Sequence, residues 1–195
     1  MVLLKEYFEL VYLKAIRILI KHKQYYECRR YIAMYNIYKT SLNAKEKRLE
    51  GIGPLEGMMF IGLNPSVSSK LDNLWDDPYG KYFSEMLREA GINPEEIYIT
   101  NLYKHSTPDN RALNDVEIQI GLKELREEII MVDPVIIVAL GTQVTDSIFP
   151  ITATKRYTIV PIYHPSYIKR FPDERSKYIE SLRRIKKYYE SHRVH

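Results

Sequence analysis

Short apolar runs along this chain alternate with longer segments in which apolar residues recur about every 3.6 positions. Four of the short runs read as strands, at residues 58–61, 97–101, 135–140 and 157–160. The run over 135–140 contains no polar residue, as expected for a strand that is covered on both faces. The pattern therefore predicts four buried strands after residue 57.

Helices are predicted around these strands. Gly91 is placed to end one helix. Asn114 is placed to cap another, with Glu117 three residues later in the capping-box position. The expected helices cover residues 2–38, 81–90 and 114–131, a short stretch after Gly141, and 172–191.

Strands that alternate with helices imply a parallel sheet with helices on both faces. We therefore predict an α/β fold with three layers, α/β/α, around a central four-stranded parallel sheet. The whole chain, 1–195, is expected to form a single domain. Its core covers residues 58–187, and residues 1–50 form an N-terminal helical extension.

Composition narrows the class of protein. With 45% hydrophobic residues, the chain can bury the core of one domain. No apolar run approaches the roughly 18 residues of a membrane-spanning helix, and charge at Lys5 and Glu6 makes the start a poor secretory signal. A single cysteine, Cys28, excludes an internal disulfide and fits a reducing cytoplasm. The many Ile, Lys and Glu residues suit a thermophilic source.

The charge is mildly basic, with a net value of +4 and a pI near 8.9, which permits nucleic acid as a partner. Lys and Arg recur from residue 155 to the end of the chain. Two interpretations stay open: a solvated helix face, or a surface that contacts phosphates beside His164. The basic residues are Lys155, Arg156, Lys169, Arg170, Arg175, Lys177, Arg183, Arg184, Lys186, Lys187 and Arg193.

Two polar loops, about 100 residues apart, each follow a predicted strand. The first reads Gly-Leu-Asn-Pro-Ser over 62–66, and the second reads His-Pro-Ser-Tyr over 164–167. Ligands of open parallel sheets bind at the carboxyl ends of the strands. We therefore expect the two loops to build one site from distant parts of the sequence.

The side chains in these loops suit particular chemistry. The amide of Asn64 can orient a water and stabilise developing charge, although it is not a base. His164 can donate to an anion or shuttle a proton, and Asn101 can read the edge of a base. Each residue has an equally ordinary structural role: an Asn-Pro-Ser turn, a structural histidine, and a satisfied amide at a strand end.

Several kinds of site lack their sequence signature. Cys28 and the five histidines show no spacing typical of metal ligands. The segment after Gly141 has neither the lysine nor the glycine spacing of a phosphate loop. No serine lies in a Gly-x-Ser-x-Gly frame. We therefore expect no metal and no cofactor.

Taken together, four ordered segments resemble the uracil-DNA glycosylase superfamily, most closely its family 4 type. The resemblance covers residues 58 to about 187. The segments are the strand with Gly62-Leu63-Asn64-Pro65-Ser66, then Ile99-Thr100-Asn101-Leu102-Tyr103-Lys104 with Pro108 and Asn110-Arg111, then Pro134-Val135-Ile136-Ile137-Val138-Ala139-Leu140-Gly141, and finally His164-Pro165-Ser166-Tyr167-Ile168-Lys169-Arg170.

This sequence departs from family 4 in two places. Cys28 is similar to the first iron–sulfur ligand of the family, but Tyr31 stands at the second cysteine, and the last two ligand positions fall near His105 and Gly121. A conventional cluster is therefore not expected. Family 4 usually has an acidic residue at the position of Leu63 and a small residue at the position of Asn64. Asn64 instead resembles the mismatch-specific and single-strand-selective branches, which have asparagine there.

The resemblance implies roles for individual residues. Asn64 would position the attacking water and His164 would bind the uracil anion. Asn101 would read the uracil edge, in a pocket that includes Gly62 and Leu63. The ring that stacks on uracil is predicted to be Tyr79, with Trp75 and Tyr82 as alternatives.

The implied partner is DNA that contains uracil. The protein is expected to act as a monomer, with no membrane as a partner. Tyr167 or Ile168 would wedge into the space left by the flipped base. The other implied DNA contacts are Pro65, Ser66, Asn110, Arg111, Ser166, Lys169 and Arg170.

The implied function is a monofunctional DNA glycosylase that excises uracil and initiates base excision repair. Two alternatives stay open: a non-catalytic DNA-binding protein on the same fold, and a glycosylase for another deaminated base or for RNA. The missing cysteines and Leu63 motivate the first alternative.

Overall fold

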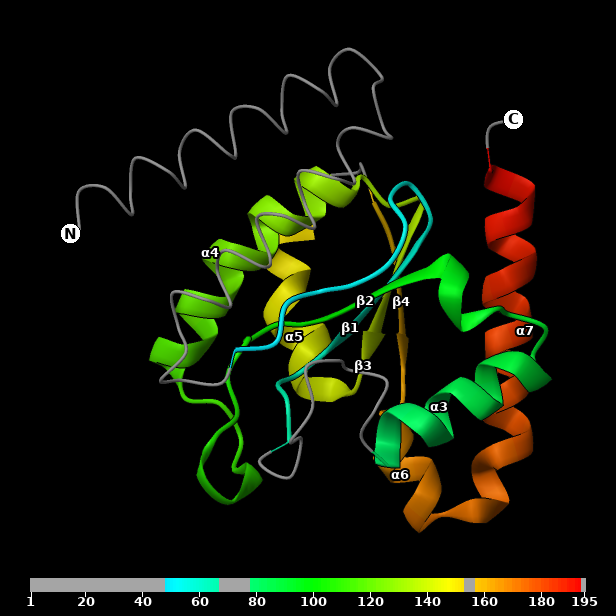
Figure 1. The fold of residues 1–195 in the computed structure, drawn as a ribbon, viewed down its shortest axis with the longest axis horizontal. Helices are drawn as coiled ribbons and strands as arrows, with labels where there is room; N and C mark the ends of the chain where they lie inside the picture. Colours follow the sequence, from blue (N-terminus) through cyan, green and yellow to red (C-terminus); the bar gives the residue numbers. More distant parts are fainter. Residues whose placement is uncertain (1–47, 67–77, 153–156, 194–195) are drawn as a thin grey trace. The chain divides into compact units, whose positions relative to one another are not determined.

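Four short parallel strands form the centre of the fold in the computed structural model, which describes residues 48–66, 78–152 and 157–193 (Figure 1). Their order across the sheet is β2-β1-β3-β4. The chain leaves β1 toward one neighbour and reaches β3 on the other side, so the strand order reverses between β1 and β3. The strands are β1 (Met58–Gly62), β2 (Ile97–Asn101), β3 (Ile136–Leu140) and β4 (Thr158–Ile162).

The predicted four-stranded parallel sheet is confirmed. The first three strands agree with the sequence pattern to within one residue at each end. The fourth starts one residue and ends two residues later than predicted, and it includes Pro161. Proline is tolerated there because β4 is an edge strand, where a missing N–H breaks no second ladder.

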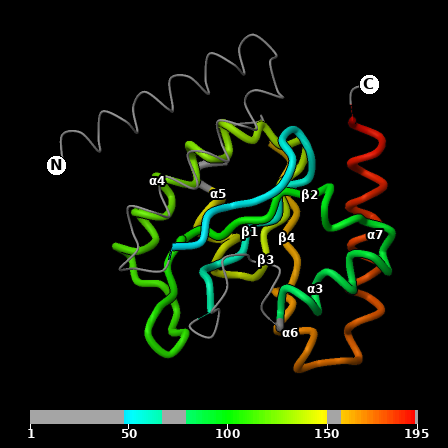
Figure 2. The backbone as a smooth tube through the Cα atoms, viewed as in Figure 1, coloured from blue at the N-terminus to red at the C-terminus, as the bar shows by residue number. Residues whose placement is uncertain are grey.

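Helices cover both faces of the sheet (Figure 1). Alternate strand residues point to opposite faces: Phe60 and Val138 pack with α3, α6 and α7, whereas Met59 and Ile137 pack with α4 and α5. Figure 2 shows these two groups of helices on either side of the strands. The helices are α3 (Pro78–Glu89), α4 (Asp115–Val132), α5 (Thr142–Thr152), α6 (Pro165–Arg170) and α7 (Arg175–His192).

The predicted start of α4 is confirmed in atomic detail. The Asn114 side chain accepts from the backbone N–H of Glu117 at 3.0 Å, and the Glu117 carboxylate accepts from the N–H of Asn114 at 2.9 Å. Arg111 adds two hydrogen bonds to the same carboxylate, at 2.7 and 2.8 Å. These contacts, with that of Arg111 the largest, lower the pKa of Glu117 to about 2.

Two helical segments differ from the sequence prediction. The segment after His164 was expected to be a loop, but it forms α6, a short helix that His164 caps. The predicted final helix over 172–191 begins with a 3₁₀ turn, η3 (Pro172–Glu174), before α7. Two further 3₁₀ turns are η1 (Pro94–Glu96) and η2 (Pro108–Asn110). The helix predicted over 2–38, with Cys28 and Tyr31, lies outside the described residues, as do Trp75, Lys155 and Arg156.

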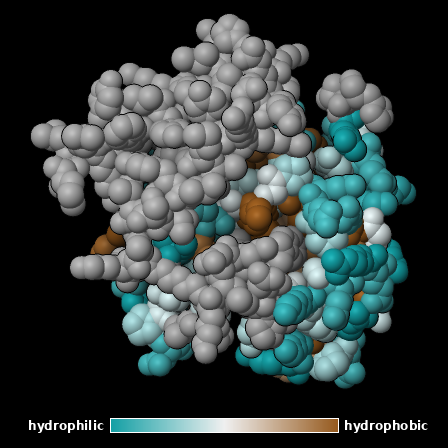
Figure 3. All heavy atoms as spheres, in the orientation of Figure 1, coloured by the Kyte–Doolittle hydropathy of each residue, from teal (hydrophilic) through white to brown (hydrophobic). Residues whose placement is uncertain are grey.

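The basic residues of α7 largely pair with neighbouring acids. Glu180 lies within ion-pair distance of Arg183 and Arg184, and Glu190 lies 3.0 Å from Lys186. Figure 3 shows hydrophilic side chains over the part of the surface formed by α3 and α7. The solvated-face interpretation of the basic run therefore fits α7, whose inner side packs on the sheet. No helix among the described residues is long and apolar enough to cross a membrane.

A buried polar network ties β2 to α4. Lys104 is only 2% exposed, and its Nζ lies 2.6 Å from the carboxylate of Glu128 and 2.7 Å from the carbonyl of Asn101. The same carboxylate accepts from the hydroxyls of Tyr98 and Thr100 at 2.9 Å each. Burial, together with the charge of Glu128, raises the pKa of Tyr98 well above its usual value. Each charge in the network thus has a partner.

Replacing Lys104 with methionine is expected to destabilise the fold by about 3–5 kcal/mol, because it leaves the Glu128 carboxylate buried without a cation. Adding Glu128→Gln should restore part of this loss, since it removes the unpaired charge. Urea unfolding measures both effects. The matched control is Lys177→Met, which breaks an exposed ion pair with Glu174 and should leave the free energy of unfolding unchanged. Equal effects at Lys104 and Lys177 would contradict this account.

Candidate active site

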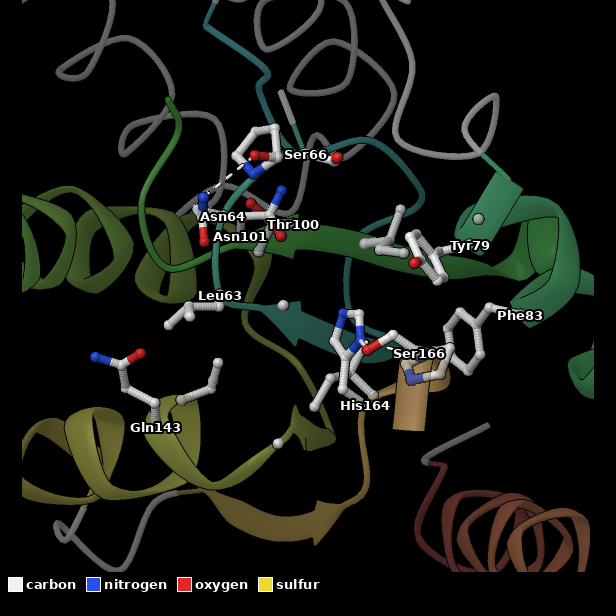
Figure 4. A pocket seen from close by; sticks show the side chains of 18 of the residues that line it. Leu63, Asn64, Ser66, Tyr79, Phe83, Thr100, Asn101, Gln143, His164 and Ser166 are labelled. Carbon is white, nitrogen blue, oxygen red and sulfur yellow. Dashed lines mark hydrogen bonds between the residues drawn. The ribbon is translucent and has the colours of Figure 1, made fainter. Parts of the chain in front are cut away.

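A cavity of about 430 Å³, which we call the main cavity, lies at the carboxyl ends of the strands, where the strand order reverses between β1 and β3. This is the position expected for a ligand site in an open α/β sheet. Both polar loops contribute to its lining, residues 62–66 from β1 and 164–166 from β4. In Figure 4, Asn64 and Asn101 lie on one side of the cavity, and His164 with Ser166 lies on another. The predicted meeting of the two loops is confirmed.

Two acceptors orient the side-chain amide of Asn64. Its Nδ2 donates to the carbonyl of Pro65 at 3.2 Å and, more weakly, to Oγ1 of Thr107 at 3.4 Å. The Thr107 hydroxyl can accept because it donates its own proton to the carbonyl of Arg111 at 2.7 Å. With Nδ2 held in this way, Oδ1 is the atom through which Asn64 can accept from a water.

A backbone contact determines the tautomer of His164. Its Nδ1 accepts from the backbone N–H of Ser166 at 3.1 Å and lies 2.8 Å from the hydroxyl of the same residue. Because a backbone N–H can only donate, Nδ1 is the acceptor and the ring proton is assigned to Nε2. His164 therefore brings a neutral Nε2–H donor to the cavity that it lines.

Asn101 lies between Gly62 of β1 and the buried polar network. It lies at the end of β2, is 7% exposed, and is in register with Gly62 of β1. A β-carbon at Gly62 would collide with Oδ1 of Asn101, so the glycine makes room for this amide. The ammonium of Lys104 donates to the backbone carbonyl of Asn101. The buried network therefore ends directly at the cavity.

Helix α3 supplies an aromatic wall. Tyr79 is 39% exposed and lines the cavity together with Phe83, one helical turn later, which is buried edge-to-face on Phe60 (Figure 4). Lys169 of α6 places its ammonium 5.3 Å from the centre of the Tyr79 ring, within the range of a cation–π contact. Tyr82, the alternative to Tyr79, packs against the core instead.

Comparison with known proteins identifies the family of this site. Residues 52–186, more than half of the chain, match the sequence model of the uracil DNA glycosylase superfamily. The chain belongs to this superfamily. The match spans both polar loops and all four strands, so the resemblance predicted from the ordered segments is confirmed.

Individual relatives agree with this assignment. The type-4 uracil-DNA glycosylase of Archaeoglobus fulgidus is 25% identical over 174 residues, which cover 77% of this chain and 84% of that protein. The type-4 uracil-DNA glycosylase of Thermotoga maritima is 30% identical over 129 residues, which cover 58% of this chain and 66% of that protein. A solution NMR structure from Methanosarcina acetivorans, described as a candidate uracil DNA glycosylase, superposes with a TM-score of 0.51 at 13% identity, covering 72% of this chain and 98% of that one. That likeness supports the fold.

The iron–sulfur ligand set of family 4 does not fit the described residues. At Gly121, a β-carbon would collide with the carbonyl of Leu102, so a cysteine cannot stand there without moving the backbone. His105 pairs through its backbone with Arg48, and its ring lies 5.3 Å from that of Tyr103. Among the described residues, no group of three or more His, Cys, Asp or Glu is arranged to hold a metal.

The predicted DNA-contacting residues fall into different places. Ser66, Asn110 and Ser166 line the cavity beside the two loops, and Pro65 is buried in its lining. Arg111 is engaged by Glu117 at the start of α4. The remaining residues lie on α6, where Arg170 donates to the carbonyl of Ser166 at 3.3 Å. Their roles on DNA stay predictions.

One of the DNA contacts needs correction. Ile168 is completely buried in the core beneath α6, so the prediction that it could wedge into DNA is wrong. The reason is that the segment is a helix and not a loop, and helical periodicity turns Ile168 inward while Tyr167 stays at the surface.

Phe83 and Gln143 are among the cavity-lining residues that sequence reasoning did not predict. Phe83 follows Tyr79 at i+4, so the same helical face could have predicted it. Gln143 lies in the first turn of α5, three residues after the end of β3, and its amide donates to the carbonyl of Leu113 at 3.0 Å. A polar side chain just after a parallel strand was the available signal for Gln143.

Replacing Gly62 with alanine tests how Asn101 is positioned. The new methyl group collides only with the end of the Asn101 side chain, so this amide should move while the fold persists, at a cost of about 1–3 kcal/mol. NMR of the side-chain amide of Asn101 and thermal unfolding measure the two effects. In Gly57→Ala, the matched control before β1, the methyl group has ordinary contacts and should leave the Asn101 resonances in place. An unmoved Asn101 amide in Gly62→Ala would contradict the account.

Proposed function

We propose that this protein is a monofunctional DNA glycosylase that removes uracil from DNA, by flipping the base into the main cavity and hydrolysing its N-glycosidic bond. One observation carries the proposal. The oriented amide of Asn64 and the Nε2–H donor of His164 come from strand ends about 100 residues apart and line the same cavity. Superfamily membership indicates the reaction class.

Binding begins with a base that leaves its stack, at a cost of a few kcal/mol. The cavity, of about 430 Å³, is large enough for a nucleobase. Tyr79 and Phe83 offer aromatic surface for the base, and a base–aromatic stack is worth about 1–3 kcal/mol. The aromatic wall therefore offsets part of the cost of flipping.

Asn101 selects the base. Its amide carries both an acceptor and a donor, which match the N3–H and O4 of uracil. Cytosine presents the reverse pattern, with an acceptor at N3 and an amino group at C4, so it would leave both groups of a buried amide unpaired. Gly62 leaves room for the Asn101 side chain and Lys104 bonds only to its backbone carbonyl, so discrimination against cytosine rests on the donor and acceptor pattern of the amide itself.

The proposed catalysis depends on stabilising uracil as an anionic leaving group. The bond between C1′ and N1 breaks with its electron pair going to uracil, and the Nε2–H of His164 donates to the carbonyl oxygen on which the negative charge develops. Asn64 holds a water through Oδ1, and the water oxygen then bonds to C1′, while its proton passes through solvent to the uracil anion, which leaves as neutral uracil. No Asp or Glu lies among the described residues that line the cavity, so this scheme uses departure of the anion and not strong base catalysis.

The absence of a lysine among the described lining residues favours a monofunctional enzyme. Strand cleavage by bifunctional chemistry needs an amine that can form a Schiff base. Lys104 lies beneath the cavity, but its ammonium is buried and bound to Glu128. Water is therefore the proposed nucleophile, and the product is an intact strand with an abasic site that enters base excision repair.

The decisive test is incubation with DNA that contains one uracil, followed by alkali, which should cleave the strand at that position. Single-stranded, G·U and A·U substrates are compared, with hypoxanthine and xanthine as alternative bases. Salt-dependent binding without base release from any of them would favour the non-catalytic DNA-binding alternative. Release of another base in preference to uracil would favour a different glycosylase.

Asn64→Ala and His164→Ala should each lower the rate of uracil release by about two or more orders of magnitude, as for other positioned catalytic groups. Because His164 also caps α6, His164→Asn is a second variant. It keeps an acceptor for the helix but lacks Nε2, and it should be as slow as alanine. Gly57→Ala is the control with unchanged activity. A His164→Asn variant with wild-type rate would remove His164 from the mechanism.

A further inference from the structure

Three aromatic rings form a continuous stack on the surface beside the main cavity. Tyr163 and Tyr167 are stacked, with ring centroids 4.4 Å apart and an angle of 20° between planes, and the ring of Phe171 lies 4.6 Å from that of Tyr167 with a tilt of 37°. Tyr167 lies in α6, whereas Tyr163 precedes its N-cap residue and Phe171 is its C-cap residue. We call this set the aromatic stack; it begins one residue before His164.

The ends of the aromatic stack are open to solvent. Tyr163 is 56% exposed and Phe171 is 50% exposed, whereas Tyr167 between them packs partly on the core. The proposed glycosylase reaction uses neither outer ring. The contacts between the rings already order the aromatic stack. A ligand that stacks on an end ring therefore costs little additional side-chain entropy.

Two cations of α6, Lys169 and Arg170, lie beside the aromatic stack. Lys169 and Arg170 lie on the same helix, α6, between Tyr167 and Phe171 in sequence. Lys177 of α7 lines a second cavity with Tyr163 and is paired there with Glu174 at 2.9 Å. Exposed aromatic faces among cations are the usual combination for single-stranded nucleic acid, with stacking for the bases and charge for the phosphates.

We infer that the aromatic stack is a platform for unpaired bases of the DNA strand that carries the target uracil, with the nearest base on Tyr163. This inference extends the proposed function, because the same strand would place its uracil beside His164. Stacking needs a free base face. In a duplex both faces of each base are covered, so the platform favours single-stranded substrate.

Binding to undamaged DNA tests the platform without reference to catalysis. The probes are single-stranded oligothymidylate and a strand of equal length built from abasic spacers, which has the same phosphates but no bases. Wild type should bind oligothymidylate about tenfold more tightly, a difference typical of one to two stacked bases. Fluorescence anisotropy at a fixed salt concentration measures both affinities, since salt changes phosphate binding.

Variants locate the effect. Tyr163→Ala and Phe171→Ala should lose most of the difference between the two strands, whereas Tyr163→Phe, which keeps the ring, should retain it. Phe149→Ala is the matched control, because Phe149 is an aromatic residue with 64% exposure on α5, outside the aromatic stack. Tyr167→Leu, checked by thermal unfolding, tests the central ring without emptying its place on the core.

The outcomes separate the platform from the reaction. No preference of wild type for oligothymidylate, or an equal preference in Tyr163→Ala, overturns the platform even if uracil release is efficient. A preference that depends on Tyr163 establishes it even if no uracil is released. With an active enzyme, Tyr163→Ala should raise KM about tenfold for single-stranded uracil DNA, with kcat unchanged; an equal rise for duplex substrate would count against the platform.

Discussion

The buried ion pair between Lys104 and Glu128 is the constraint on which the site depends. Two charges taken out of water are tolerated only when each is fully paired, and here the hydroxyls of Tyr98 and Thr100 and the carbonyl of Asn101 complete the network. The network joins the end of β2 to α4. As a result the strand end that carries Asn101 at the floor of the main cavity is bonded to the network through its backbone, and Gly62 leaves room for the Asn101 side chain.

Each of the two polar loops orients one functional side chain of the site. Thr107 and Pro65 orient the amide of Asn64, and the backbone of Ser166 determines the tautomer of His164. In the proposed roles, Asn64 accepts from a water and His164 donates as a neutral ring. A superfamily site with Leu63 in place of an acid can therefore still stabilise a leaving anion, which is the step that a dissociative reaction requires.

The surface around the site distinguishes two kinds of basic residue. Cations on α7 largely pair with acids of the same helix or of α3, so they contribute little attraction for a phosphate backbone. Lys169 and Arg170 on α6 lie beside the cavity and the aromatic stack. We therefore propose that contacts with DNA concentrate on this one short helix, whereas the inner side of α7 packs on the sheet.

The sequence by itself determined the four strands, the start of α4 and the place of the site, because strand periodicity, the Asn114 cap and polar residues after strands are local signals. Only the tertiary structure decided which way individual side chains face. Ile168 turns into the core because its segment is a helix, Phe83 reaches the cavity because α3 packs there, and Arg111 is drawn to Glu117. The packing of α3 and α6 on the sheet depends on residues far away in sequence, about which local patterns carry no information, whereas the ion pair of Arg111 with Glu117 spans only six residues.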